Sequence, residues 1–481
     1  MTNRRLFVYC VVMMARSPGQ DTAPPIRIWG ADLSGSIRAR IENWDWFKAP
    51  PAQSSYAYGA GILRIALARS YSWVDWQAEG AFPLYVNLPR NAVAPDPQGP
   101  LGYGGDYYLA NRQQNIAAAV LRQAFVRFRS ADARTTFRLG RLEFADGAEA
   151  VPRDPALAAL KRDRINQRLI ATFNYALRSF DGGQFNYTGN EWNVTAMVAR
   201  VVEGSFQVRA FDEIDVALAY GAFTRQLASR RASSEGRLFV VYYNDGRPVL
   251  KTDNRPSNAL EADRQPIRLA TPGAHWISMI RAGPGTADLL LWGAGQFGRW
   301  GSQQHVAGEV AAEIGYRFPV GIQPWVRAGY FRSTGDPNPA DGQHNTFFQI
   351  LSTPRAYARF PSYILMNVED SFGQFRATPH RNVALRSELH FIRLSNSGDL
   401  WYDGGGAFQQ GTFGYLGRPS GDRRAIGTAL DLNADWTVSK KTTLSFYGGV
   451  MRGSAVPALV FPAGGQRPVV HLLSLELMRR F

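Results

Sequence analysis

The chain ends with His471–Phe481, which reads HLLSLELMRRF. Successive side chains of a β-strand point to opposite faces, so Leu473, Leu475 and Leu477 share one face with the terminal Phe481. The opposite face carries mostly polar side chains. A two-faced last strand that ends on an aromatic residue is typical of the closing strand of an outer-membrane β-barrel, and a soluble sheet is the alternative.

The same alternation recurs along the whole chain. In 309–318 (EVAAEIGYRF) and 430–438 (LDLNADWTV), apolar residues occupy every second position and acidic residues lie between them. Segments of about ten residues with one apolar and one charged face are typical of transmembrane barrel strands. The sequence therefore predicts an all-β fold, a transmembrane antiparallel β-barrel of about 18 strands.

Loop lengths test this prediction independently, because barrels alternate long extracellular loops with short periplasmic turns. We expect short turns near 70–71, 130–133, 180–183, 319–320, 396–398 and 439–441. Long polar stretches occupy 84–115, 144–164, 244–274 and 334–379, and shorter links occupy 45–56, 413–424 and 454–467. An even number of strands results if 185–202 and 205–225 form one strand each.

Composition agrees with a barrel and excludes other classes. The 481 residues include 28 Phe, 20 Tyr and 12 Trp, but no apolar run long enough for a transmembrane helix. The formal net charge is +15, with 49 Arg and only 5 Lys. Nucleic-acid binders usually use many lysines as well, so we expect no nucleic-acid partner. Arginine suits capture of carboxylates or ion-pair ladders, although a GC-rich genome also favours Arg codons.

The N-terminus predicts export. Arg4 and Arg5 precede an apolar stretch, Leu6–Ala15, which is the pattern of a signal peptide. We therefore expect residues 1–20 to be a cleaved signal peptide and residues 26–481 to form a single barrel in the outer membrane of a Gram-negative bacterium. Cys10 is the only cysteine and lies in this stretch. Outer-membrane lipid surrounds such a barrel, and a terminal Phe481 is a signal for the barrel-assembly machinery.

One long loop has helical composition. Residues 151–169 read VPRDPALAALKRDRINQRL, in which Asp154 and Pro155 make a plausible helix cap and first position. This basic loop either folds inward to narrow the pore or forms a short helix on the outer surface. An inward position predicts a cationic constriction that selects anions.

No catalytic or metal-binding signature accompanies these strands. The six histidines show no HExxH motif and no metal-ligand spacing, and no nucleophile elbow is present. His390 shares a polar strand face with Arg386 and Glu388, which indicates a lumen network. We therefore expect no enzymatic activity, no cofactor and no metal.

The inward faces of the strands carry charges of both signs, which can pair into ladders that stiffen a wide barrel. Arg38, Arg40 and Arg138 belong to this set. Its other members are Arg64, Arg317, Arg386, Glu42, Asp75, Glu79, Glu309, Glu313, Glu388, Asp431 and Asp435.

Five segments resemble the alginate export family of outer-membrane barrels. They are Gly140–Gly147, Lys161–Ile170, Arg178–Phe185, Tyr242–Pro256 and Ser333–Phe347, and the resemblance extends over about 30–481. It implies a monomeric barrel of about 18 strands whose Arg-lined constriction passes an anionic uronic-acid polysaccharide outward. Matching these motifs implies Arg141, Arg162, Arg164 and Arg168 as pore residues.

Together these observations predict a channel for passive translocation of an acidic polysaccharide or a related acidic solute, with periplasmic export partners possible. Arginines would replace the hydration of passing carboxylates weakly and at several sites. The main alternative is a substrate-specific or general diffusion porin for small acidic solutes. A barrel-embedded surface enzyme is a third hypothesis, which requires Ser, His and an acid at the outer rim.

Overall fold

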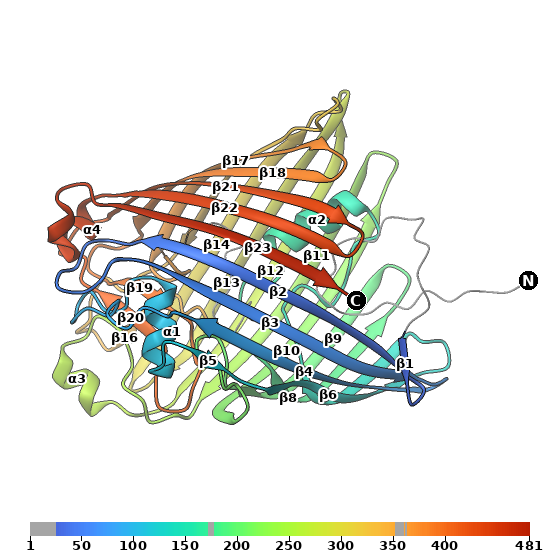
Figure 1. Ribbon diagram of the computed structural model, residues 1–481, viewed down its shortest axis with the longest axis horizontal. Coiled ribbons are helices and arrows are strands. Elements are labelled where there is room, and N and C mark those ends of the chain that lie inside the picture. Colours follow the sequence, from blue (N-terminus) through green and yellow to red (C-terminus); the bar gives the residue numbers. More distant parts are fainter. Residues whose placement is uncertain (1–25, 172–177, 352–359, 361–362) are drawn as a thin grey trace, which may run out of the picture.

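The computed structural model describes residues 26–171, 178–351, 360 and 363–481. Over these residues the chain forms a closed antiparallel β-barrel of eighteen strands, as the sequence predicts (Figure 1). The proposed signal peptide, residues 1–20, lies outside the described residues and stays a prediction.

The barrel closes between its first and last long strands. Ser36 lies opposite Arg480, and Asp45 lies opposite His471. The N–H group of Phe481 donates to the carbonyl oxygen of Gly35 at 3.1 Å, so the terminal aromatic residue continues the ladder. Closure leaves no unpaired sheet edge, which the apolar interior of a membrane would not tolerate.

Eighteen long strands form the wall within the described part of the chain. They are β2 (Ala31–Asp45), β3 (Ser55–Ser70), β4 (Val74–Val86), β6 (Val120–Arg129), β7 (Thr135–Leu142), β8 (Phe180–Thr188), β9 (Trp192–Val202), β10 (Glu213–Ala228), β11 (Ala232–Asp245), β12 (Ile267–Ala282), β13 (Gly285–Trp300), β14 (Gln303–Arg317), β15 (Trp325–Ser333), β17 (Val368–His380), β18 (Val383–Leu394), β21 (Ala425–Ser439), β22 (Thr442–Gly453) and β23 (Val469–Arg480).

The connections differ between the two ends of the barrel. Short turns gather at the end where the C-terminus lies, on the right in Figure 1, which is the periplasmic end. Most connections at the other end are long and carry the small elements. These elements are β5 (Ile116–Ala117), β16 (Gln343–His344), β19 (Trp401–Gly404), β20 (Tyr415–Arg418), α1 (Tyr103–Asn111), α2 (Pro155–Arg164), α3 (Ser257–Ala262), α4 (Ala455–Val460) and the 3-10 turn η1 (Pro462–Gly464). The short strand β1 (Ile26–Ile28) lies at the periplasmic end, where it pairs with the beginning of β2. None of the helices in the described ranges is long and apolar enough to cross a membrane.

The alternation read from the sequence separates an outer face from an inner face. On β14, Ile314 is 63% exposed on the outside of the barrel, whereas Glu313 is buried on the inside. On β21, Leu432 is likewise exposed on the outside and Asp431 is buried on the inside. Exposed apolar side chains are stable here because lipid, and not water, surrounds them.

Three of the expected boundaries are wrong. Residues 180–183 begin strand β8 and are not a turn, and residues 396–398 lie in the extracellular loop between β18 and β21. The tight turn of that region is at 381–382. The two strands expected at 185–202 and 205–225 are in fact three, namely β8, β9 and β10.

The glycines of β8 explain the first error. A Cβ atom on Gly182 would lie only 2.1 Å from the carbonyl oxygen of Val198 on the neighbouring strand. Glycine is therefore required there because two strands approach closely, and not because the chain turns. The same reason holds for Gly404 of β19, where a Cβ atom would lie 2.3 Å from the carbonyl oxygen of Gly414.

Candidate functional site

The loop between β7 and β8 folds into the barrel. Its helix α2 begins as the sequence predicts: Asp154 accepts hydrogen bonds from the N–H groups of Ala156 (2.8 Å) and Leu157 (2.9 Å), and Pro155 is the first helical residue. At the other end of α2, Lys161 and Arg164 are completely buried and pair with residues of the barrel wall. Of the two positions considered for this loop, the inward one is correct.

Arg164 joins α2 to the far wall of the lumen. Its Nε and Nη2 atoms donate to the two carboxylate oxygens of Glu313 on β14, each at 2.9 Å, and its guanidinium group lies 4.6 Å from the ring centroid of Phe372. Glu313 also pairs with Arg327 of β15 at 2.9 Å. Buried charges are stable only when they are paired in this way, so these contacts fix the loop across the lumen.

Arg168 lies beside this centre and is also buried. Its Nε donates to the carbonyl oxygen of Arg164 at 2.7 Å, Nη2 is 3.5 Å from Glu313, and the guanidinium group lies 5.0 Å from the ring centroid of Trp292. Burial lowers the pKa of Arg168 to about 9, although the neighbouring carboxylates oppose this shift. The side chain is therefore cationic at neutral pH, but its charge is compensated by protein groups.

Arg162 and Asp163 face a more open part of the lumen. Arg162 is about a third exposed, and its Nε lies 3.2 Å from Asp163, which also pairs with Arg376 of β17. Burial by itself would raise the pKa of Asp163, but Arg376 and Arg162 outweigh it and lower this pKa to about 2. Among the predicted pore arginines on α2, Arg162 is thus the one that a solute in the lumen can reach.

The first part of the loop reaches the periplasmic end of the barrel. The side-chain amide of Gln226, near the end of β10, donates to the carbonyl oxygen of Val151 at 3.0 Å. Arg153 donates to the carbonyl oxygen of Asn190, in the short turn between β8 and β9. The loop therefore extends through the barrel from the outer end almost to the periplasmic turns.

Lys161 completes the attachment of α2. Its Nζ atom lies 2.6 Å from Glu235 of β11 and donates to the carbonyl oxygen of Ala150 at 2.7 Å. Burial lowers the pKa of Lys161, and Glu235 opposes that shift. Strands β11, β14 and β17 thus each provide an ionic partner for the helix.

The arginines predicted on the barrel wall are paired as well. Arg38 and Arg40 of β2 each donate to Glu476 of β23 at 2.8 Å, across the closing seam of the barrel. Arg40 also donates to Glu42 at 2.7 Å. These contacts confirm the ion-pair ladders that the mixed strand faces predict.

Arg138 and Arg141 lie on opposite faces of β7. Arg138 points into the barrel, whereas Arg141 shares the outward face of Phe137 and Leu139, which are 42% and 54% exposed. The structure therefore places Arg141 outside the pore, contrary to the expectation.

Arg141 forms a bidentate pair with Asp181 of β8, at 2.8 and 2.6 Å. Arg138 donates to Gln184 of β8 and lies over the ring of Phe125 at 5.3 Å. Six of the seven predicted pore arginines therefore interact with residues on neighbouring strands or within the loop assembly, and Arg162 pairs with its neighbour on α2.

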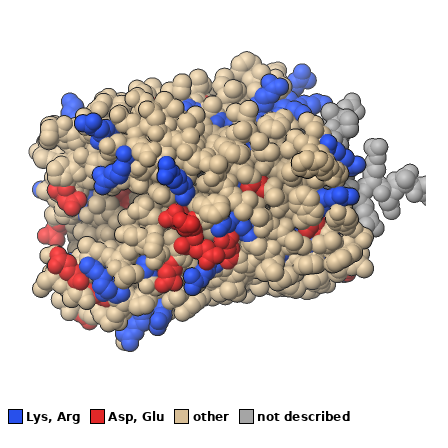
Figure 2. Space-filling view, turned by 60° about the horizontal axis from the view of Figure 1, so that its bottom comes forward, with Lys and Arg blue, Asp and Glu red and all other residues tan. Residues whose placement is uncertain are grey.

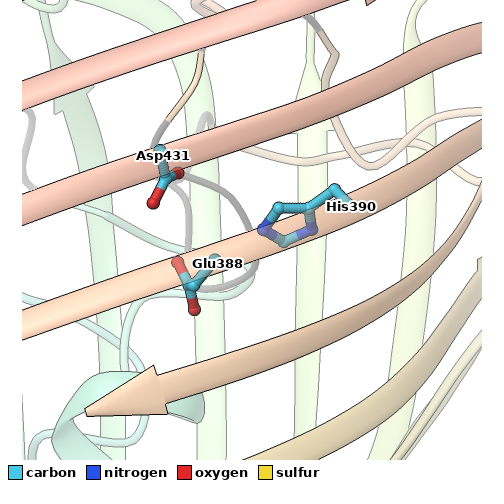
Figure 3. Close-up of side chains that lie close together, drawn as sticks. All are labelled: Glu388, His390 and Asp431. Carbon is cyan, nitrogen blue, oxygen red and sulfur yellow. The ribbon is translucent and has the colours of Figure 1, made fainter.

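One cluster has the residue types of a metal site. Glu388 and His390 of β18 and Asp431 of β21 point toward one another inside the barrel (Figure 3), with ligand atoms within 4.8 Å. However, His390 Nδ1 is bonded to Asp370 at 2.8 Å, and Arg386 pairs with Glu388 at 2.6 Å. The cluster is therefore the hydrogen-bonded lumen network that the sequence predicts around His390.

The extracellular loops pack over the outer end of the barrel. Phe47, after β2, stacks on Phe461 beside α4 with ring centroids 5.0 Å apart. Arg178 is completely buried and donates to Ser205 at 2.6 Å and to the carbonyl oxygen of Gly405 at 3.1 Å, which joins three loops. These contacts give the outer end a defined shape, and sequence patterns do not indicate them.

A further basic region escaped the sequence analysis. The periplasmic turns carry exposed cationic side chains against two exposed acids, Asp132 and Glu191. We call the cationic set the periplasmic collar, and it consists of Arg134, Arg230, Arg231, Arg381, Lys440 and Lys441. Figure 2 shows basic side chains toward both ends of the barrel, including a group at the right-hand end. The net charge of +15 could have indicated this exposed basic region, because charges that are paired in the lumen leave the positive excess at the surface.

The family model for alginate export matches residues 90–458. The chain belongs to the alginate export family. A search of curated proteins found no match. The family and the closed barrel identify the chain as a channel protein of the Gram-negative outer membrane.

Solved structures share the barrel fold. OccK11 (OpdR) of Pseudomonas aeruginosa is 12% identical, with a TM-score of 0.53 over 94% of this chain and 96% of that one. The outer-membrane protein OpdK of the same organism is 9% identical, with a TM-score of 0.53 over 94% and 99% of the two chains. Acinetobacter baumannii OccAB4 is 8% identical, with a TM-score of 0.55 over 93% and 98%. At these identities the likeness concerns the fold alone.

Proposed function

We propose that this alginate-export-family channel moves an anionic polysaccharide from the periplasm to the cell surface, without a chemical step. The periplasmic collar carries this proposal, because a cationic ring at the entrance attracts a polyanion and speeds its encounter with the channel. Membership of the family supports the choice of a uronic-acid polymer as the solute.

The lumen contributes pairs that can exchange partners. Arg162 is partly exposed and shares Asp163 with Arg376, so a carboxylate of the polymer could replace Asp163 at either arginine. Contacts of this kind are weak and repeated, which lets a polymer leave as well as enter. Direction would come from synthesis in the periplasm and from export partners there.

A second candidate is a diffusion porin for small acidic solutes. It is favoured by the way in which the loop with α2 crosses the lumen and is fixed by the buried pair of Arg164 and Glu313. A polymer requires this loop to move aside or to leave a continuous path, whereas small solutes require only narrow gaps. The two candidates therefore differ in whether a long chain can pass.

Planar-bilayer recordings with a single inserted channel separate them. We expect oligouronates of about ten or more residues to interrupt the current when added on the periplasmic side, with a frequency that falls as salt rises. Replacing the six cationic residues of the collar by Gln should reduce that frequency at least about tenfold. The control is neutral dextran of equal length.

Interruption by monomeric uronate alone, with no effect of the longer chains, would favour the porin. Equal interruption by dextran and oligouronate would contradict both candidates, because the channel would then not distinguish an acidic solute from a neutral one. Hydrolysis or elimination products in the recording chamber would instead support a barrel-embedded enzyme.

A further inference from the structure

Four adjacent strands carry a row of charged residues on the outside of the barrel. Arg332 of β15 lies directly opposite Glu369 of β17, and Glu369 lies directly opposite Arg393 of β18. Arg424 immediately precedes β21, the next strand along. The neighbours Phe331 and Asp370 are buried inside the barrel, so Arg332 and Glu369 point outward.

Glu369 holds the three guanidinium groups together. Its carboxylate lies 3.5 Å from Arg332 and 3.0 Å from Arg424, and it also accepts a hydrogen bond from Nε of Arg393. Arg424 is further fixed by donating to the carbonyl oxygen of Leu394 at 2.8 Å. The carboxylate is almost completely buried beneath these side chains, and a hydrogen-bonded cluster of this kind is a built site.

The row carries an excess of positive charge. Within the described parts of the chain, Glu369 is the only carboxylate that pairs with any of these three arginines. The side chains of Arg332, Arg393 and Arg424 nevertheless remain 51%, 57% and 42% exposed. Three cations against one anion repel one another, and a further anion in front of them would relieve that repulsion.

The row lies at the outer edge of the apolar band. Tyr330 and Phe391 lie on the same outward faces, each two positions closer to the middle of the membrane than Arg332 and Arg393. They are 38% and 55% exposed. An aromatic residue followed by arginine marks the boundary between acyl chains and headgroups. Since the row is at the extracellular ends of its strands, the headgroups beside it are those of the outer leaflet.

A second outward pair lies at the extracellular ends of β12 and β13. Arg268 of β12 and Arg299 of β13 are direct cross-strand partners, and both are exposed. Arg268 donates to Asn244 at 3.3 Å, which contributes no negative charge. Like charges directly opposite each other destabilise a sheet unless an anion lies between them.

We propose that the row Arg332–Glu369–Arg393–Arg424 binds a phosphorylated headgroup of the outer-leaflet glycolipid. Arginine forms bidentate hydrogen bonds to phosphate oxygens, and two strand spacings separate Arg332 from Arg393 by about 10 Å. This width admits a sugar phosphate across the row. The acyl chains would then lie against the apolar strand faces below. The site is separate from the lumen and does not depend on the transported solute.

Native mass spectrometry of the delipidated protein in non-ionic detergent tests this site. The probe is bisphosphorylated lipid A, compared with the same lipid after removal of its phosphates. The variant Arg332→Gln/Arg393→Gln leaves Arg424 to pair with Glu369, so no buried carboxylate is left alone. We expect lipid A to bind this variant about tenfold or more weakly than the parent protein. Arg225→Gln/Arg479→Gln, which removes two exposed arginines near the periplasmic end, is the matched control and should bind as the parent does.

The outcomes are decisive in either direction. Lipid A binding that is equal in the parent and the Arg332/Arg393 variant, or equal with and without lipid phosphates, overturns the proposal. Competition by millimolar inorganic phosphate at the same residues would indicate a site for free phosphate, and would also overturn it. If the double variant does not show heat-dependent gel mobility, the single variant Arg393→Gln replaces it, with an expected loss of severalfold.

Discussion

The arginines inside the barrel and those of the periplasmic collar share a chemistry but not an environment. Arg164 is completely buried and forms two hydrogen bonds to Glu313. Arg230 and Arg231 of the collar are exposed. An ion that leaves water must find a partner, whereas an exposed ion keeps its hydration. The positive charge available to a solute is therefore mainly at the mouth of the channel, and the buried arginines mainly hold the inserted loop.

The largest effect should come from removing the carboxylate at the centre of the lumen. In Glu313→Gln, Arg164 and Arg327 lose their shared partner in a buried site, which should destabilise the protein by roughly 3–5 kcal/mol. Urea titration of the protein in liposomes measures this. Glu191→Gln, in an exposed periplasmic turn, is the control and should change stability by less than about 0.5 kcal/mol. Equal effects of both variants would remove the distinction between the two regions.

The single-channel current should also depend on the pair of Arg164 with Glu313. If the pair with Glu313 fixes the loop, Arg164→Ala should raise single-channel conductance severalfold, because α2 loses its bond to the far wall. Arg162 lies two residues before Arg164 and on another face of the same helix. The variant Arg162→Ala therefore keeps the bond to Glu313 and should change conductance little. A conductance that is unchanged in Arg164→Ala would mean that the loop is held without this pair.

Ion selectivity should depend on the collar. Replacing Arg230, Arg231, Arg381, Lys440 and Lys441 by Gln removes exposed charge without breaking a buried pair. We expect the reversal potential under a salt gradient to shift toward cation selectivity, and the shift to shrink as ionic strength rises. A shift that persists at about 1 M salt would indicate that the selective charges lie in the lumen.

Acid should give the smallest effect, through Asp163. Its pKa of about 2 is lower than the ordinary value of 3.8, so the stabilisation from its pair with Arg376 is fully present above pH 3.8 and is lost as the pH falls through about 2. Current recordings should therefore become noisier between pH 4 and pH 2. Asp163→Asn should show the noisier current already at pH 5, and a variant that is as quiet as the parent at pH 5 would contradict this role.

Sequence patterns predicted much of the wall. The alternation of Ile314 with Glu313, and of Leu432 with Asp431, was enough to assign the outward and inward faces, because strand geometry fixes that alternation locally. The same patterns gave a wrong boundary where glycine can mark either a turn or a close approach of two strands. The glycines at 182 and 183 look like a turn, but both lie within β8, and Gly182 lies where β8 approaches β9.

The sequence by itself determined the class of the fold, the inward and outward face of each clear strand, and the cap of α2 by Asp154, since these follow from local periodicity and local hydrogen bonds. Only the tertiary structure decided that α2 lies inside the barrel, that Arg164 meets Glu313 and that Arg332 and Arg393 converge on Glu369. These partners are far apart in the chain, and closure of the barrel is what brings them into contact. A local sequence pattern does not indicate which two charged residues, distant in the chain, will form an ion pair.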